Sequence, residues 1–419
     1  MDAGTLPWHA RLRLYAIPAM MDLVAGIILF VPVVRAKHLG RSYFDSVFLT
    51  ALWLCVVAAT NLAAGRWIAP RATRVWCVVG LLGQAAACLG LAASSGWDGM
   101  AAWLVLSGVA HVVFFTPFQV LMKIVGAGGE HRRLAEATGL YVMAWGLGMA
   151  AGPLASGWLF GLGTPGEGWR LAFYTAAWMC AAALALLFSL ARGERWRLGL
   201  ERAEAAGAAE APSPSEGRAT PADGEKPPPD LAWAGWIGCG AMSLALNLVR
   251  GLFPAGAVAQ GVPESVQGSV LGLAHFMQAV TGLALGRYWA GWMYRARPVV
   301  VLGLLGVLAT AAFAFPALSG ASDAKALASG YLAAGILFGV FAGYGGFYGI
   351  YHSLADSSRA GRNVAVNEAV LSLTGLAIPV LGGLGADAWG MAPPFLAAAA
   401  VVVFATAWQA RAHRRHPYP

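Results

Sequence analysis

The chain has 419 residues, of which 58% are hydrophobic and only 11% are charged, and its formal net charge is +8. Soluble domains carry about 25% charged residues, so this composition excludes an ordinary soluble protein. The basic residues stand in short clusters between apolar stretches, which argues against a nucleic-acid partner and favours contact with a lipid bilayer.

Twelve apolar stretches are long enough to cross a bilayer, which takes about 20 helical residues for a core of about 30 Å. They predict an all-α, polytopic membrane protein. The first stretch is too long for the core of a signal peptide, and no small-residue cleavage site follows it, so we expect it to remain as an anchor. The predicted spans are 14–34, 44–65, 75–93, 101–123, 138–160, 170–191, 233–258, 265–286, 299–318, 327–351, 364–386 and 392–409.

The basic residues also predict an orientation, because Lys and Arg accumulate in cytoplasmic loops. Of the 28 Lys and Arg residues, 22 fall in segments on the side of the N-terminus, five fall on the opposite side, and Arg250 lies within a span. We therefore expect both termini to be cytoplasmic, in the cytoplasmic (inner) membrane of a prokaryote.

Residues 192–230 differ from their surroundings, since they include the run PSPSEGRATPADGEKPPP, which has too little apolar surface to fold alone. This composition predicts a flexible cytoplasmic linker between an N-terminal six-helix bundle, residues 1–191, and a C-terminal six-helix bundle, residues 231–419.

A comparison of the two parts at a shift of about 222 residues indicates an internal repeat, as expected for parallel repeats related by an axis along the membrane normal. The matches lie at collinear loop and helix-end positions, which favours duplication over chance. The matched landmarks are Gly65, Arg66 and Arg74 with Gly286, Arg287 and Arg295, Pro32 with Pro254, and Gly168 with Gly390.

The fifth predicted span contains small residues on one face followed by a proline. Gly148 and Gly152 are four residues apart, so another helix can approach the backbone there, and Gly157 continues the small-residue pattern. Pro153 removes a backbone donor and bends the helix. Such a bent interface helix is suited to movement of one bundle against the other, although a static contact would use the same residues.

These features resemble the major facilitator superfamily over essentially the whole chain. The run from Gly148 to Gly157 looks like that family's GxxxGP motif, which is strongest in antiporter branches, and Gly168-Trp169-Arg170 looks like the usual opening of the sixth span. The loop from Gly65 to Arg74 is similar to the family's loop motif, but Ala69 stands where an acid is usual. The resemblance implies a 6+6 helix transporter that works by alternating access, and we expect a functional monomer.

Ionisable side chains within the spans are the main candidates for function, because each costs at least about 2.5 kcal/mol at a helix centre. Asp22 lies about eight residues into the first span, and we expect it to bind and release a proton during transport; the alternative is a fixed hydrogen bond or salt bridge. Glu368, about one turn into the eleventh span, is a second proton-coupling candidate or a hydrated helix-start acid. Arg250, in the seventh span, either binds an anion or Asp22, or extends to the outer interface.

Several neutral polar side chains are further candidates for a substrate cavity. His111, His275 and Gln278 lie near mid-depth, where they can bind a ligand or a neighbouring helix. Tyr344 and Tyr348, with Tyr351, form one aromatic face on a glycine-rich helix, which either lines a substrate path or packs in the core.

No catalytic or metal-binding pattern emerges from the sequence. Gly161, Gly163 and Gly166 match a dinucleotide fingerprint by letters only, since no strand precedes them, and P-loop, HExxH and GxSxG patterns are absent from the sequence. We expect no enzyme activity, no cofactor and no metal. The prediction is secondary active transport of a small solute, coupled to protons, with antiport and efflux favoured over symport; the alternative is a non-transporting sensor or scaffold on the same fold.

Overall fold

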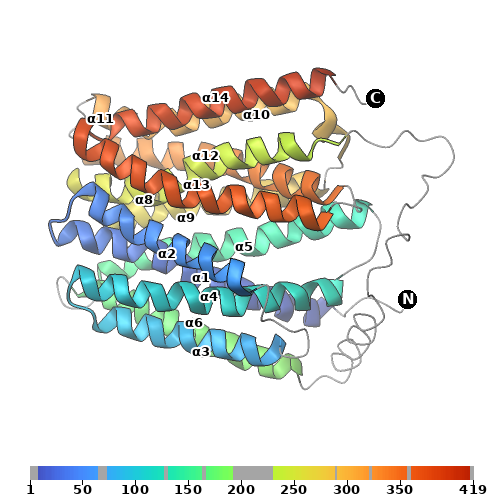
Figure 1. Cartoon of the computed structure of the whole chain (residues 1–419). Coiled ribbons are helices and arrows are strands. Elements are labelled where there is room, and N and C mark those ends of the chain that lie inside the picture. Colours follow the sequence, from blue (N-terminus) through green and yellow to red (C-terminus); the bar gives the residue numbers. More distant parts are fainter. Residues whose placement is uncertain are drawn as a thin grey trace.

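The computed structural model describes residues 8–64, 73–126, 131–162, 167–191, 230–287, 290–319, 323–355 and 360–415, and within these ranges the chain is helical and contains no strand. Twelve long helices run roughly alongside one another (Figure 1). The predicted all-α class with twelve long helices is thereby confirmed. The long helices are α1 (Trp8–His38), α2 (Tyr43–Ala64), α3 (Thr73–Ala93), α4 (Trp97–Gly126), α5 (His131–Phe160), α6 (Gly168–Ala191), α8 (Ala232–Ala259), α9 (Glu264–Arg287), α10 (Ala296–Ala312), α12 (Ala324–Ala355), α13 (Ala360–Trp389) and α14 (Ala392–Arg415).

Ten of these helices are long and apolar enough to cross a membrane. The other two are α10, which is apolar but has only 17 residues, and α5, whose 30 residues include a polar beginning and five glycines. The chain is therefore an integral membrane protein with a glycine-rich fifth helix. The predicted linker lies outside the described residues except for Asp230 at its end.

The predicted ninth span, 299–318, is wrong as a continuous helix. Helix α10 ends at Ala312, and a separate short helix, α11 (Phe315–Ser319), follows it. Pro316 explains the break, because it has no N–H to donate and its ring disfavours helical backbone before it. The N–H groups of Phe313 and Ala314 bond instead to carbonyls three residues earlier, in tight turns.

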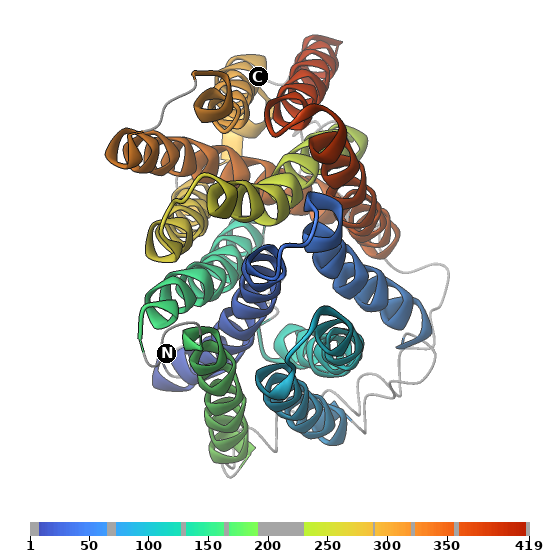
Figure 2. The ribbon, with the colours of Figure 1, turned by 90° about the vertical axis from the view of Figure 1, so that its left-hand side faces the viewer.

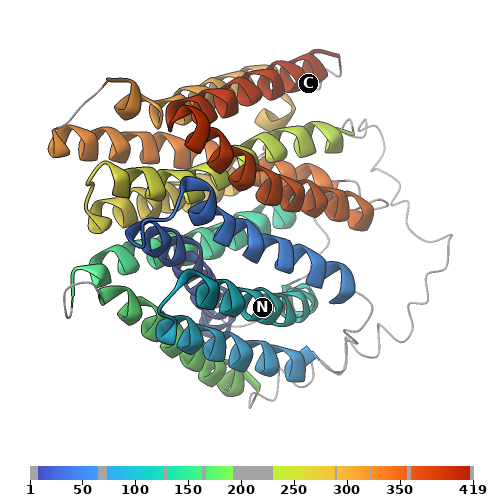
Figure 3. The same ribbon diagram turned by 60° about the vertical axis from the view of Figure 1, so that its left-hand side comes forward.

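Helix α1 begins and helix α14 ends at the same end of the bundle, which we call the terminus end, and the opposite end is the far end (Figure 1). Figure 2 looks along the helices from the far end: α1 to α6, the N-half, lie below α8 to α14, the C-half. The two halves meet mainly through α5 with α9, α2 with α13 and α1 with α8, and Figure 3 shows α5 and α9 side by side between them.

Helices α1 and α8 are the most enclosed spans. In their most apolar stretches 83% and 78% of residues are buried, compared with 33–50% for the other candidate spans. Most side chains in these stretches therefore face protein rather than lipid, and buried polar groups on such helices are candidates for acting on a solute.

Candidate functional site

The two enclosed helices each carry one buried charged residue at the contact between the halves. Asp22 on α1 is 3% exposed and Arg250 on α8 is 8% exposed. Their charges interact electrostatically without a direct ion pair. Each half therefore contributes one member of a buried pair of opposite charge, and the Arg250 side chain is enclosed by the bundle rather than extended to its surface.

Arg250 is held by a short chain of hydrogen bonds within the C-half. Its Nε–H donates to Nε2 of His275 over 3.1 Å, and Nδ1 of His275 lies 2.9 Å from Oε1 of Gln278. Because Nε2 accepts a hydrogen bond, the proton of a neutral imidazole lies on Nδ1 and is donated to Gln278. Three of the residues predicted as cavity candidates, Arg250, His275 and Gln278, are thus in direct contact.

Two donor groups in this hydrogen-bonded series make no hydrogen bond to the described residues. Nη2 of Arg250 and Nε2 of Gln278 are buried, and neither has a hydrogen-bond partner among the described residues. A buried donor without an acceptor costs about 1–3 kcal/mol, and more when it is charged. Two such donors on neighbouring side chains are suited to a ligand with acceptor atoms.

An aromatic side chain from the N-half completes the site. The guanidinium carbon of Arg250 lies 5.7 Å from the ring centroid of Trp145 on α5, within the range of a cation–π interaction. The Trp145 and His275 rings meet edge to face with centroids 6.3 Å apart. Trp145 was not among the residues selected from the sequence, although a tryptophan deep inside a predicted span, away from the headgroup boundary, was the available signal.

The GxxxGP run of α5 packs tightly on both sides of this site. A Cβ built on Gly148 would lie against the carbonyl oxygen of Ala19 and 2.8 Å from Cβ of Asp22. Farther along α5, Gly157 faces Gly268 on α9, where a built Cβ would lie 3.1 Å from Cα. Helix α5 thus lies between α1 of its own half and α9 of the other, and a larger side chain at either glycine would separate them.

The other predicted cavity residues lie elsewhere. Tyr344 and Tyr348 on α12 are buried in the core of the C-half. The glycines of α12 face Gln278 instead, since a Cβ built on Gly346 would be 4.0 Å from Nε2 of Gln278. The Tyr348 hydroxyl is 3.0 Å from Nε2 of His413 on α14. His111 lies between the rings of Trp53 and Phe115, at 4.8 and 4.4 Å, within the N-half.

Glu368 is also separate from Asp22. Its side chain on α13 is exposed, and it interacts electrostatically with Cys239 on α8. Cys239 precedes Arg250 by eleven residues, or about 16 Å along the helix. The two predicted proton-coupling acids therefore lie at different depths, and only Asp22 lies close to Arg250.

The structure describes only part of the predicted loop motif. Gly65 and Arg66 lie outside the described residues. Arg74 is half-buried, and its Nε and Nη2 have no hydrogen-bond partner within the described ranges. In the second half Gly286 is buried, Arg287 is exposed at the end of α9, and Arg295 lies immediately before α10.

At the far end, two polar contacts that the sequence did not reveal join the halves. Nε2 of His38, at the end of α1, lies 2.8 Å from Oε1 of Glu264, at the start of α9. The carboxylate of Asp387 on α13 accepts hydrogen bonds from the backbone N–H groups of Tyr43 and Phe44, both at 2.9 Å. A carboxylate from one half thus caps the first turn of a helix in the other.

A bundle of apolar helices with buried polar groups where its halves meet is the architecture expected of a membrane transporter. The chain belongs to the Major Facilitator Superfamily, whose family model matches residues 14–358. It is similar to the crystal structure of a bacterial homologue of the human lysosomal transporter Spinster in an inward-facing and occupied conformation, with a TM-score of 0.62 at 16% identity, covering 99% of this chain and 98% of that chain.

A second solved structure, of the human organic anion transporter MFSD10, has a TM-score of 0.57 at 16% identity and covers 96% of this chain and 100% of that chain. No curated protein sequence matches the chain. At these identities the two structures establish the shared fold, while the family match over residues 14–358 confirms the recognition made from the sequence motifs.

Proposed function

We propose that this transporter moves a small solute with an anionic or hydrogen-bond-accepting group, that it couples this movement to protons through Asp22, and that Arg250 binds the acceptor group of the solute. The observation that carries the proposal is the pair of unused buried donors, Nη2 of Arg250 and Nε2 of Gln278, next to a buried carboxylate on the opposite half.

The chemistry of the pair supports coupling. An ionised Asp22 interacts favourably with Arg250 and competes with an anionic solute for it. When the solute occupies Arg250, Asp22 loses that favourable interaction, and its neutral, protonated form is the less costly one at a buried position. By linkage, protonation of Asp22 then favours solute binding to the same degree.

The position of the pair supports alternating access. Asp22 and Arg250 lie on different halves, and α5, with close glycine contacts to both α1 and α9, lies beside them. Movement of one half against the other changes the distance between the two charges, so the occupancy of the site and the arrangement of the halves influence each other.

The direction of coupling has two candidates, each favoured by a different observation. The competition of Asp22 and an anion for Arg250 favours movement of solute and proton together. The GxxxGP motif favours proton antiport with efflux. The neighbouring structure described as an organic anion transporter supports an anionic solute in either case.

Flux into vesicles containing the purified protein tests the proposal. A panel of radiolabelled carboxylates, organic phosphates, neutral sugars and amines is offered with an imposed pH gradient of either polarity. We expect acceptor-rich solutes to move, Arg250→Gln to abolish their uptake, and Arg170→Gln, which alters an ion pair within the far-end part of the N-half, to preserve it. The gradient polarity that drives uptake identifies symport or antiport. Uptake of amines alone, or uptake that persists in Arg250→Gln, would contradict the proposal, and no movement of any solute would favour a sensor.

A further inference from the structure

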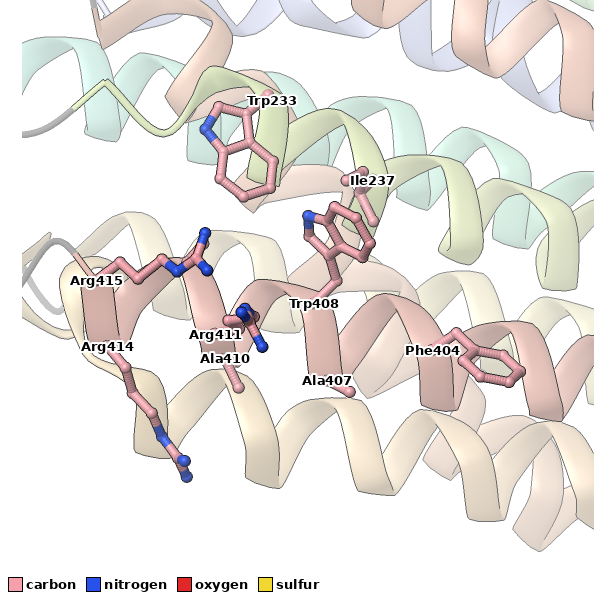
Figure 4. Close-up of a pocket in the computed structure, with 10 residues that line it drawn as sticks. Trp233, Ile237, Phe404, Ala407, Trp408, Ala410, Arg411, Arg414 and Arg415 are labelled. Carbon is pink, nitrogen blue, oxygen red and sulfur yellow. The ribbon is translucent and has the colours of Figure 1, made fainter.

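The outer face of the C-half has a groove that the transport site does not use. It has a volume of about 1030 Å³ and lies between α8 and α14 near the terminus end. Figure 4 shows Trp233 and Ile237 on α8 opposite Phe404 and Trp408 on α14. The volume is at the upper end of the range of ligand pockets, about 300–1000 Å³.

The two ends of the groove differ in chemistry. Toward the middle of the helices the lining is apolar, with Phe404 75% and Trp408 59% exposed. At the terminus end it is basic, with Arg411, Arg414 and Arg415 in the last two turns of α14. In Figure 4 Arg415 extends into the space between the helices and Arg411 lies in front of α14, whereas Arg414 leans to the other side of that helix.

The two helices that form the groove carry no negative charge in their described residues. Helices α8 and α14 contain no acidic residue, and none lines the groove within the described ranges. Asp230, which precedes α8, accepts a hydrogen bond from the N–H of Ala232 over 3.1 Å and so serves the start of that helix. The groove therefore presents positive charge at one end and apolar surface along its length.

The length of the groove corresponds to one leaflet of a membrane. Phe404 and Arg415 are eleven residues apart on α14, or about 16 Å, and half of a bilayer core is about 15 Å. Tryptophan is enriched at the headgroup boundary; Trp233 lies toward the basic end, and Trp408 lies between the arginines and Phe404.

We propose that this groove is a binding site for one anionic phospholipid, whose phosphate contacts Arg411 and Arg415 and whose acyl chain lies along Trp408 and Phe404. Basic pockets between membrane helices have the charge that anionic headgroups require, and each arginine near such a surface contributes attraction. The site is separate from Asp22 and Arg250, so it does not depend on the proposed solute.

Native mass spectrometry of the delipidated full-length protein tests the proposal, with dioleoyl phosphatidylglycerol compared with dioleoyl phosphatidylcholine. We expect at least one phosphatidylglycerol molecule to bind about tenfold more tightly than phosphatidylcholine, and an excess of inorganic phosphate not to displace it. We expect Arg411→Gln/Arg415→Gln to lower this affinity about tenfold. The control Arg13→Gln/Arg287→Gln removes the same charge from exposed positions on α1 and α9 and should leave it unchanged.

A second pair of variants keeps the charge constant. Ala407 lines the groove and is exposed, so Ala407→Phe should fill it and weaken phosphatidylglycerol binding. Ala400, two turns earlier on α14, is exposed and does not line the groove, so Ala400→Phe should have no effect. Equal binding of the two lipids, equal loss in a variant and its control, or displacement by inorganic phosphate would overturn the proposal. If the acidic residues of 192–230 covered the arginines, phosphatidylglycerol and phosphatidylcholine would bind equally.

Discussion

Nε–H of Arg250 donates a hydrogen bond to Nε2 of His275 over 3.1 Å, and this bond joins α8 to α9 at the point where both meet the N-half. It fixes the direction of the guanidinium and leaves Nη2 without a partner among the described residues. Trp145 from the other half lies over the same guanidinium. The only basic residue well inside a predicted span is therefore a positioned group at the junction of the two halves.

Replacement of His275 should impair solute binding more than protein stability. We expect His275→Ala to raise the KM for the transported solute about tenfold, because Arg250 loses the acceptor that orients it, a charged hydrogen bond of about 1.5 kcal/mol or more. Vesicle uptake at several solute concentrations measures this change.

His111 offers a matched control for that prediction. It lies between Trp53 and Phe115 within the N-half, so His111→Ala should lower the thermal midpoint and leave KM within about twofold. If the two variants raise KM equally, His275 has no special role in positioning Arg250.

The contact of α5 with α1 should tolerate no side chain at Gly148. A methyl group there would meet the backbone of Ala19, which cannot move independently of its helix, so Gly148→Ala should destabilise the protein by about 1–3 kcal/mol. Thermal unfolding in detergent measures this effect.

Gly330 is the control for this substitution, since a Cβ built there has no atom within 4 Å. Gly330→Ala on α12 should be neutral or slightly stabilising, because alanine favours a helix over glycine by about 1 kcal/mol. A thermal midpoint of Gly148→Ala equal to that of Gly330→Ala would show that the close packing of α5 on α1 is not needed.

The hydrogen bonds that Asp387 accepts from the start of α2 should hold the two halves together at the far end. Asp387→Ala removes the acceptor of two backbone N–H groups in α2. We expect this to destabilise the conformation in which the halves touch at the far end by about 1 kcal/mol. Spin labels at Leu39 and Ala259, with the exposed Cys55 replaced by Ser, should show a broader and longer distance distribution in this variant.

Glu167→Ala is the control for the far-end contact. It removes a carboxylate of the same end, but its ion pair with Arg170 lies within the N-half, three residues along the chain. The label distance should stay unchanged in this variant. A distance that changes in Glu167→Ala as in Asp387→Ala would mean that the cap does not join the halves.

The sequence predicted the helical class and most helix positions because apolar length alone requires them in a bilayer. It missed the break after Ala312, although Pro316 was visible, because a hydropathy count does not register a lost backbone donor. Spacing along one helix also placed Tyr344 and Tyr348 on a common face, but it did not reveal whether that face meets solute or the α14 core.

The candidate site was less predictable for a physical reason. Arg250 and Asp22 are 228 positions apart, and whether their charges meet depends on the rotation of α1 and α8 about their own axes. The contacts of Asp387 with Tyr43 and Phe44 use backbone groups, which have no signature in the sequence. Such contacts between distant segments become visible only when the helices are packed.

Proton coupling through Asp22 is tested most directly by pH-driven uptake in vesicles containing Asp22→Asn, with Glu368→Gln as the matched control. The amide keeps the size of Asp22 and cannot change its charge, so we expect an imposed pH gradient to lose its effect on uptake, while solute exchange without a gradient continues. Glu368 lies at another depth, and its variant should keep the full response to the gradient. Gradient-driven uptake that persists in Asp22→Asn would contradict the central claim that Asp22 couples protons to transport.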